Sequence, residues 1–163
     1  MSPRAAWRLE TLGFDQVYDY AAGKADWGAA GLPRQGTVAS DPSAGDAADP
    51  DVPTCLLQDD LPSVRARVHA SGWDQCIVVN EQRIVLGRLG RKALAADDLR
   101  CAEEAMSAGP STVRPNVPLA ELEQRLGRHG LRSALVTTNE GRLIGAVRKA
   151  VVASCVDRQR LPD

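Results

Sequence analysis

The sequence lacks a long apolar run. None of its segments approaches the ~20 consecutive apolar residues that a membrane-spanning helix needs. The first ten residues, MSPRAAWRLE, also lack the apolar stretch of a secretory signal peptide. We therefore expect neither a membrane partner nor secretion, and we expect a cytoplasmic protein.

The sequence also lacks an excess of charge of either sign. Its 20 Lys and Arg residues against 21 Asp and Glu residues give a formal net charge of -1. Such a chain has no global attraction to polyanions. Nucleic acid is therefore not an expected partner.

Metal-ligand spacing is absent as well. The four cysteines, Cys55, Cys76, Cys101 and Cys155, are far apart, and no C-x-x-C pair or suitably placed His accompanies them. Zinc sites need such clusters, so no metal site is expected. Free cysteines are often buried as small apolar side chains, and this is the interpretation we give to Cys55 and Cys76.

Aromatic residues are scarce, at 4% of the chain, and they gather at its beginning. Five of the six lie in the first 27 residues: Trp7, Phe14, Tyr18, Tyr20 and Trp27. Composition predicts a helix over 4–12, a short strand over 17–20 and a helix over 24–30. So small a segment cannot bury its own aromatic surface, so we expect it to dock on folded protein.

This segment, SPRAAWRLETLGFDQVYDYAAGKADWGAAGLP, resembles the last third of a rhodanese domain. In that family the catalytic Cys lies in a loop just before the first of these helices. The chain begins at Met1, where that loop would be ending, and all four cysteines lie further along. We therefore expect residues 1–33 to be a rhodanese-like remnant without sulfurtransferase activity. Residues 34–52, rich in Pro, Gly, Ala, Ser and Asp, are expected to be a flexible linker.

The remainder of the chain contains an internal repeat. A shift of 58 positions aligns two segments without a gap and gives six identities in 34 positions. The identical pairs are Thr54/Thr112, Leu61/Leu119, Arg67/Arg125, Gly72/Gly130, Val78/Val136 and Gly87/Gly145. Units this short cannot bury an apolar face alone, so the two copies should pack together.

Each copy predicts the order strand, helix, strand, strand, helix. In the second copy Pro118 precedes Leu119, Leu122 and Leu126 at helical spacing, and Gly130 ends the helix. Two strands over 134–138 and 142–147 follow, joined by an Asn-Glu-Gly turn, and then a helix over 149–157. The corresponding segments of the first copy are 61–71, 76–80, 83–89 and 92–95.

The second copy, TVRPNVPLAELEQRLGRHGLRSALVTTNEGRLIGAVRKA, resembles a CBS domain, and the two copies together resemble a CBS pair. The resemblance implies an α/β (α+β) fold with units over 53–98 and 99–157, packed about a pseudo-twofold axis, and a tail over 158–163. It also implies a disc-like homodimer. Its cleft would take adenosine-containing ligands such as AMP, ADP, ATP or S-adenosylmethionine.

Both copies depart from the nucleotide motif of that family. A Ser or Thr and, three residues later, an Asp follow the last strand there, and the Asp holds the ribose hydroxyls. Gly90 and Arg148 stand at the hydroxyl position, and Ala93 and Val151 stand at the acidic position. The carboxylate that could accept two hydrogen bonds from the ribose is therefore missing from both copies.

Basic pairs, Arg91-Lys92 and Arg148-Lys149, stand at the same joint in both copies. They could hold a phosphate near a helix start, or they could be solvated side chains on an exposed helix turn. We expect a ligand to lie between the units, near the strand ends and these pairs, with the phosphates by Arg148 and Lys149. The candidate contacts are Thr54, Cys76, Gly87, Leu89, Arg91, Lys92, Thr112, Ala134, Gly145, Val147, Arg148 and Lys149.

Three functions fit these observations. The first is a non-enzymatic regulatory or sensing module without catalytic residues that binds an adenosine nucleotide. The second is a structural dimerisation module whose clefts bind no ligand, which the missing carboxylates favour. The third, a sulfurtransferase, would need a cysteine loop that the sequence lacks.

Overall fold

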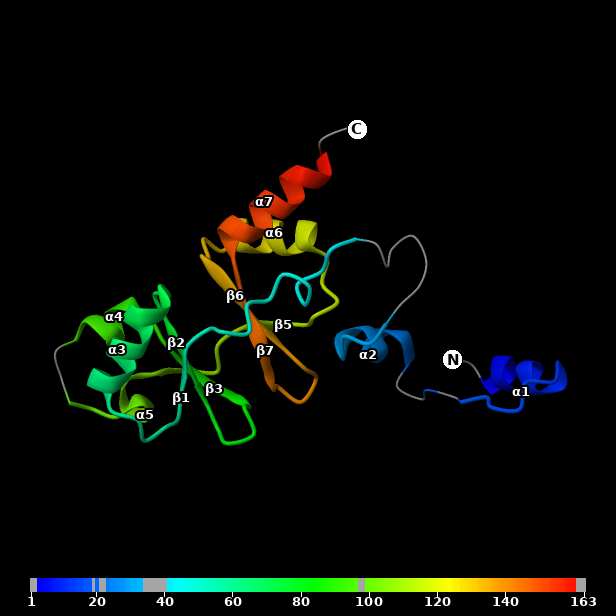
Figure 1. The fold of residues 1–163 in the computed structure, drawn as a ribbon, viewed down its shortest axis with the longest axis horizontal. Coiled ribbons are helices and arrows are strands. Elements are labelled where there is room, and N and C mark those ends of the chain that lie inside the picture. Colours follow the sequence, from blue (N-terminus) through cyan, green and yellow to red (C-terminus); the bar gives the residue numbers. More distant parts are fainter. Residues whose placement is uncertain (1–2, 19, 21–22, 34–40, 97–98, 161–163) are drawn as a thin grey trace.

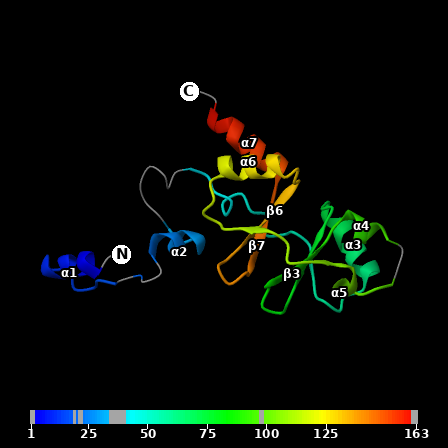
Figure 2. The ribbon, with the colours of Figure 1, turned by 180° about the vertical axis from the view of Figure 1, so that it is seen from behind.

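The computed structural model of the chain describes residues 3–18, 20, 23–33, 41–96 and 99–160. Two small sheets lie side by side, each with helices on its outer face (Figure 1). A short amino-terminal region projects from this core (Figure 2). The predicted α/β fold of two β-α-β-β-α units is confirmed by the order of the elements.

The first unit contains β1 (Thr54–Cys55), α3 (Leu61–Ser71), β2 (Cys76–Val79), β3 (Val85–Leu89) and α4 (Arg91–Ala95). β2 lies between β1, which is parallel to it, and β3, which is antiparallel. α3 begins after Asp60, whose carboxylate accepts a 2.9 Å hydrogen bond from the Ser63 amide. It ends at Gly72, which has the left-handed conformation that favours glycine (φ 66°).

The second unit follows α5 (Ala102–Ala105) and β4 (Ser107–Ala108), and β4 adds a fourth strand to the first sheet beside β3. Its own elements are β5 (Thr112–Val113), α6 (Leu119–Arg128), β6 (Ser133–Thr137), β7 (Leu143–Arg148) and α7 (Lys149–Arg160). β6 lies between β5 and β7 with the same directions as in the first sheet.

Three apolar clusters form the core. Val64, Cys76 and Leu89 belong to a cluster between the first sheet and its helices, and Leu122 and Val147 belong to the matching cluster of the second unit. The third cluster lies between the sheets and comprises Val52, Trp73, Ile77, Val79, Leu135, Leu143 and Ala146. Both faces of β2 are thus buried, which explains its continuous apolar sequence, Cys-Ile-Val-Val.

The repeat extends further toward the amino terminus than the sequence identities indicate. Ser43 forms an isolated β-bridge with Pro118, and Cys101 forms one with Asp60. The two bridges are equivalent, because Cys101 lies 58 positions after Ser43 and Pro118 lies 58 positions after Asp60. In both places the backbone amide donates to a carboxylate three residues later: that of Ser43 to Asp46, and that of Cys101 to Glu104. The segment that leads into each unit therefore packs on the other unit.

This arrangement corrects the predicted linker. Of residues 34–52, only 41–52 are described, and they are packed against the second unit. Asp49 and Ala146 exchange backbone hydrogen bonds of 2.9 and 3.0 Å, and Ala44 is fully buried. This segment lies so close to the second unit that only small residues fit. Its composition therefore resembles that of a flexible linker.

The amino-terminal region contains α1 (Pro3–Thr11) and α2 (Gly23–Ala29), as predicted. The predicted strand over 17–20 is wrong for its described residues, which have no strand partner, and Asp19 lies outside them. α2 contacts the second unit, because Asn139 donates a hydrogen bond to Asp26. α1 lies away from both units, and Trp7 is 66% exposed, so the predicted docking is not made by α1 within one chain.

Candidate functional site between the two units

The pseudo-twofold relation brings equivalent residues face to face between the sheets. The Gln75 side-chain amide donates a 2.9 Å hydrogen bond to the Ser133 hydroxyl, and these residues are 58 positions apart. Ile84 and Arg142, another equivalent pair, form an isolated bridge at the far ends of the hairpins. The Gln75–Ser133 pair lies at the floor of a cleft between the units, and this cleft is the candidate site.

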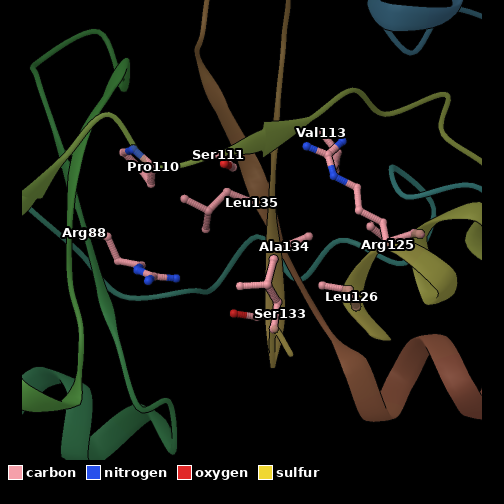
Figure 3. Close-up of a pocket in the computed structure, with 11 residues that line it drawn as sticks. Arg88, Pro110, Ser111, Val113, Arg125, Leu126, Ser133, Ala134 and Leu135 are labelled. Carbon is pink, nitrogen blue, oxygen red and sulfur yellow. The ribbon is translucent and has the colours of Figure 1, made fainter. Parts of the chain in front are cut away.

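A pocket of about 120 Å³ opens beside Ser133 (Figure 3). We call it the Arg88–Arg125 pocket, because Arg88 of β3 and Arg125 of α6 approach it from opposite units. Its remaining lining is mostly apolar: Pro110, Ser111, Val113, Leu122, Leu126, Leu131, Ser133, Ala134 and Leu135. Neither arginine has a hydrogen-bonding or ionic side-chain partner among the residues that the structure describes.

A more open basic groove adjoins this pocket. The basic groove is lined by four cations and one carboxylate: Arg91, Arg132, Arg148, Lys149 and Asp74. Asp74 binds Arg91 at 2.8 Å and lies 3.9 Å from Arg132. A space of about 330 Å³ that includes Arg88, Gln75 and Ser133 connects the basic groove to the Arg88–Arg125 pocket. The combined cleft carries a clear excess of positive charge.

Arg148 is held in place at the edge of the basic groove. Its guanidinium lies 4.0 Å from the centre of the Trp73 ring, and it donates a 3.3 Å hydrogen bond to the Gly72 carbonyl. Such a cation–π contact orients the guanidinium without neutralising it. The charge stays available to an anion in the basic groove.

The predicted contact residues fall into two groups. Arg91, Arg148 and Lys149 line the basic groove, and Ala134 lines the Arg88–Arg125 pocket. The other members line neither the Arg88–Arg125 pocket nor the basic groove: Thr54, Cys76, Gly87, Leu89, Lys92, Thr112, Gly145 and Val147. Cys76, Leu89 and Val147 are fully buried on the helix sides of their sheets, because alternate strand residues face opposite sides.

The two repeat glycines have a packing role instead. A Cβ atom on Gly145 would lie 2.5 Å from the Asp49 carbonyl oxygen, and one on Gly87 would lie 2.2 Å from the Met106 sulfur. Each glycine therefore lets the segment leading into the other unit approach the last strand. This accounts for both glycines without a ligand.

Sequence reasoning missed Arg88, Arg125, Arg132 and Trp73. Arg88 faces the cleft because it alternates with the buried residues Gly87 and Leu89 along β3. Arg125 was visible as one of the six repeat identities, but nothing in the sequence showed that its equivalent Arg67 has partners and Arg125 has none. The repeat alignment showed that Arg125 is equivalent to Arg67, but only the packing of the two units shows that Arg125 lies at a pocket.

The thiols of Cys55 and Cys76 lie next to each other in the core of the first unit. The hydrogen bond with Cys55, together with burial, raises the pKa of the Cys76 thiol far above its ordinary value. Cys76 is therefore an inert, protonated side chain at neutral pH. This agrees with the expectation of a buried structural residue.

Two further features are absent from the described part of the chain. None of its helices is both long and apolar enough to cross a membrane. Within the same residues, no group of three or more His, Cys, Asp or Glu side chains could hold a metal ion.

Comparison with known proteins identifies the class of fold. The family model of the CBS domain matches residues 102–153, which cover most of the second unit. Among the curated proteins, none matches the chain. A single CBS domain is thus supported by sequence, and the first unit is placed beside it by structure.

Solved structures show the same pair of units. A structure of CBSX2 with AMP has a TM-score of 0.67 at 15% identity, covering 74% of this chain and 99% of that one. A CBS domain pair with 5'-methylthioadenosine and S-adenosyl-L-methionine has a TM-score of 0.63 at 13% identity, covering 74% and 99%. The fold is therefore that of a CBS domain pair.

A third structure is part of a larger protein. The cytosolic domain of the Mg²⁺ channel MgtE with ATP has a TM-score of 0.64 at 22% identity and covers 72% of this chain. The chain spans about half the length of that domain, and about half of the soluble part of a magnesium transporter. These likenesses concern the fold.

Proposed function

We propose that the protein is a non-enzymatic regulatory module that binds an adenosine nucleotide in the cleft between its two units. The observation that carries this proposal is the basic groove, where Arg91, Arg132, Arg148 and Lys149 surround the single carboxylate Asp74. Phosphates favour such clusters of guanidinium and ammonium groups. Structures with the same fold were solved with AMP, with ATP and with S-adenosyl-L-methionine.

The size of the cleft agrees with this ligand class. Ligand sites in proteins typically measure roughly 300–1,000 Å³, so the Arg88–Arg125 pocket of about 120 Å³ is too small by itself. The connected space of about 330 Å³ brings the cleft into this range. A planar base in the pocket and phosphates in the basic groove would use both parts.

The missing acidic residue changes how such a nucleotide is recognised. Val151 and Ala93 cannot accept hydrogen bonds from ribose hydroxyls, so the phosphates and the base must supply most of the affinity. The rival function, a structural module that binds no ligand, rests on the same absence. Binding measurements separate the two functions.

A thermal-shift series with AMP, ADP, ATP, S-adenosylmethionine and adenosine tests the proposal. A ligand at 100 times its dissociation constant stabilises the folded protein by about 2.7 kcal/mol, so the melting temperature should rise by several degrees. AMP, ADP and ATP should raise the melting temperature more than phosphate-free adenosine does. Arg148→Ala should reduce the shift, and Lys92→Ala, at an exposed cation outside the cleft, should leave it unchanged. No shift with any compound at millimolar concentration favours the structural function.

We also propose that the chain forms a homodimer and acts in the cytoplasm. The support for the dimer is exposed apolar surface on the amino-terminal region, where Trp7, Phe14 and Tyr18 are more than half exposed. Light scattering should return the mass of two chains, and a monomer mass would contradict this part. The rhodanese-like origin of residues 1–33 stays a prediction, and thiocyanate formation from thiosulfate and cyanide should not exceed that of a cysteine-free variant.

A further inference from the structure

We infer that the chain holds one ligand per pair of units, in the Arg88–Arg125 pocket and the adjoining basic groove, and that the equivalent pocket of the first unit is closed. This inference rests on the proposed function and adds to it the number and position of the sites. Its basis is a comparison of each pocket residue with its repeat counterpart, the residue 58 positions earlier or later.

The first difference is at Leu131, whose counterpart is Trp73. Leu131 lines the Arg88–Arg125 pocket, whereas the larger Trp73 is 8% exposed and packs in the apolar cluster between the sheets. The counterpart of Arg88 is Ala146, which is fully buried in the same cluster. Trp73 also lines the basic groove, but with Ala146 it fills the space that is equivalent to the Arg88–Arg125 pocket with apolar packing.

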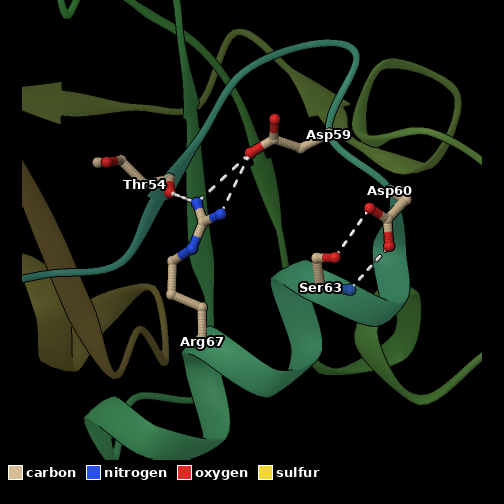
Figure 4. A network of polar contacts seen from close by, with 5 residues as sticks. All are labelled: Thr54, Asp59, Asp60, Ser63 and Arg67. Carbon is tan, nitrogen blue, oxygen red and sulfur yellow. Dashed lines mark hydrogen bonds and ion pairs between the residues drawn. The ribbon is translucent and has the colours of Figure 1, made fainter.

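The second difference is at Arg125, whose counterpart is Arg67. Arg67 donates to the Thr54 carbonyl and forms an ion pair of 3.4 Å with Asp59 (Figure 4). The residue equivalent to Asp59 in the second unit is Val117, which offers no carboxylate. Arg125 is therefore left without a side-chain partner among the described residues, at the wall of the pocket.

These differences assign separate roles to two arginines that the repeat makes identical. Arg67 joins the end of β1 to α3 within the first unit, so it stabilises the fold. Arg125 is exposed and unpaired, so its guanidinium can stack on a planar base or bind an anionic group of a ligand. Arg88 adds a second cation from the other unit, so that a ligand in the pocket touches both units.

Calorimetric titration of the full chain with ATP tests the inference. We expect one equivalent of ATP per chain. Arg125→Ala should weaken ATP binding roughly three- to tenfold with little change in melting temperature. Arg67→Ala, its matched control, should lower the melting temperature and leave ATP affinity unchanged.

Leu131→Trp copies the closed pocket into the second unit and should abolish ATP binding while the circular dichroism spectrum stays that of the wild type. Two equivalents of ATP per chain would overturn the inference. Equal losses of ATP affinity in Arg67→Ala and Arg125→Ala would also overturn it. Either result would leave the proposed function standing. Arg125→Ala does not depend on tolerance of a larger side chain, so it decides the matter if Leu131→Trp fails to fold. Absence of binding of ATP and of every other compound in the thermal-shift series to the wild type would overturn the proposed function, and this inference with it.

Discussion

Substitution of Gly145 by Ala tests whether this glycine serves packing between the units. The added Cβ would lie 2.5 Å from the carbonyl oxygen of Asp49 and 2.8 Å from its carbonyl carbon, both of which are backbone atoms. The Asp49 backbone cannot move away freely, because it exchanges two hydrogen bonds with Ala146. Overpacking of this kind costs about 1–3 kcal/mol, which corresponds to a fall in melting temperature of roughly 2–12 °C for a chain of this size.

Two other glycines provide matched comparisons. An added Cβ on Gly87 would meet the Met106 side chain, whose flexible end can move, so Gly87→Ala should cost less than Gly145→Ala. Gly127 lies within α6, and an added Cβ there would meet no atom within 4 Å. Gly127→Ala should therefore raise the unfolding free energy, by up to about 1 kcal/mol, because alanine favours the helix.

Differential scanning calorimetry of the three variants measures these effects. The expected order of melting temperature is Gly127→Ala, wild type, Gly87→Ala and, lowest, Gly145→Ala. A Gly145→Ala variant as stable as the wild type would refute the close approach of residues 49–50 to β7. It would also favour Gly145 as a ligand contact, as the sequence predicts.

Further predictions concern the core and one helix cap. Leu122→Ala, at a fully buried side chain of α6, should lower the unfolding free energy in urea by about 2–5 kcal/mol, whereas Glu121→Ala on the exposed side should change it little. Hydrogen bonds from the Ser63 amide and hydroxyl lower the pKa of Asp60 below its ordinary value of 3.8. Its contribution to stability is therefore complete at neutral pH and is lost as the pH falls through the lowered pKa. The stability difference between wild type and Asp60→Ala should shrink below about pH 4, and a difference independent of pH would contradict this role.

Much of the fold could be predicted because local signals agreed with one another. Pro118, the leucines of α6 and Gly130 mark one helix in the sequence, and the second copy of the repeat supports the first. The pairing of segment 43–49 with the second unit could not be predicted, because backbone hydrogen bonds carry it and small residues leave no apolar pattern. The predicted strand over 17–20 is wrong for the opposite reason. Its apolar and polar residues alternate as in a strand, but a strand forms only beside a neighbouring strand.

The site was predictable only in part for a similar reason. Arg148 ends β7 and Lys149 begins α7, and the basic pair at this joint in both copies of the repeat is visible in the sequence. Cys76 and Val147 are predicted ligand contacts because they lie near strand ends, but the strand register turns them to the helix side of each sheet. Arg67 has a carboxylate partner in Asp59, whereas its equivalent Arg125 has only Val117 at the corresponding position. The sequence contains this difference, but only the structure shows that Arg67 reaches Asp59.

A crystal structure of the full chain grown with ATP tests the central claim most directly, because it shows where the ligand lies. We predict density for one nucleotide per chain between the units, with its phosphates within hydrogen-bonding distance of Arg148 or Lys149, and no second nucleotide at the first unit's equivalent of the Arg88–Arg125 pocket, beside Arg67 and Ala146. A cleft that stays empty at millimolar ATP, or a nucleotide bound outside it, would contradict the account.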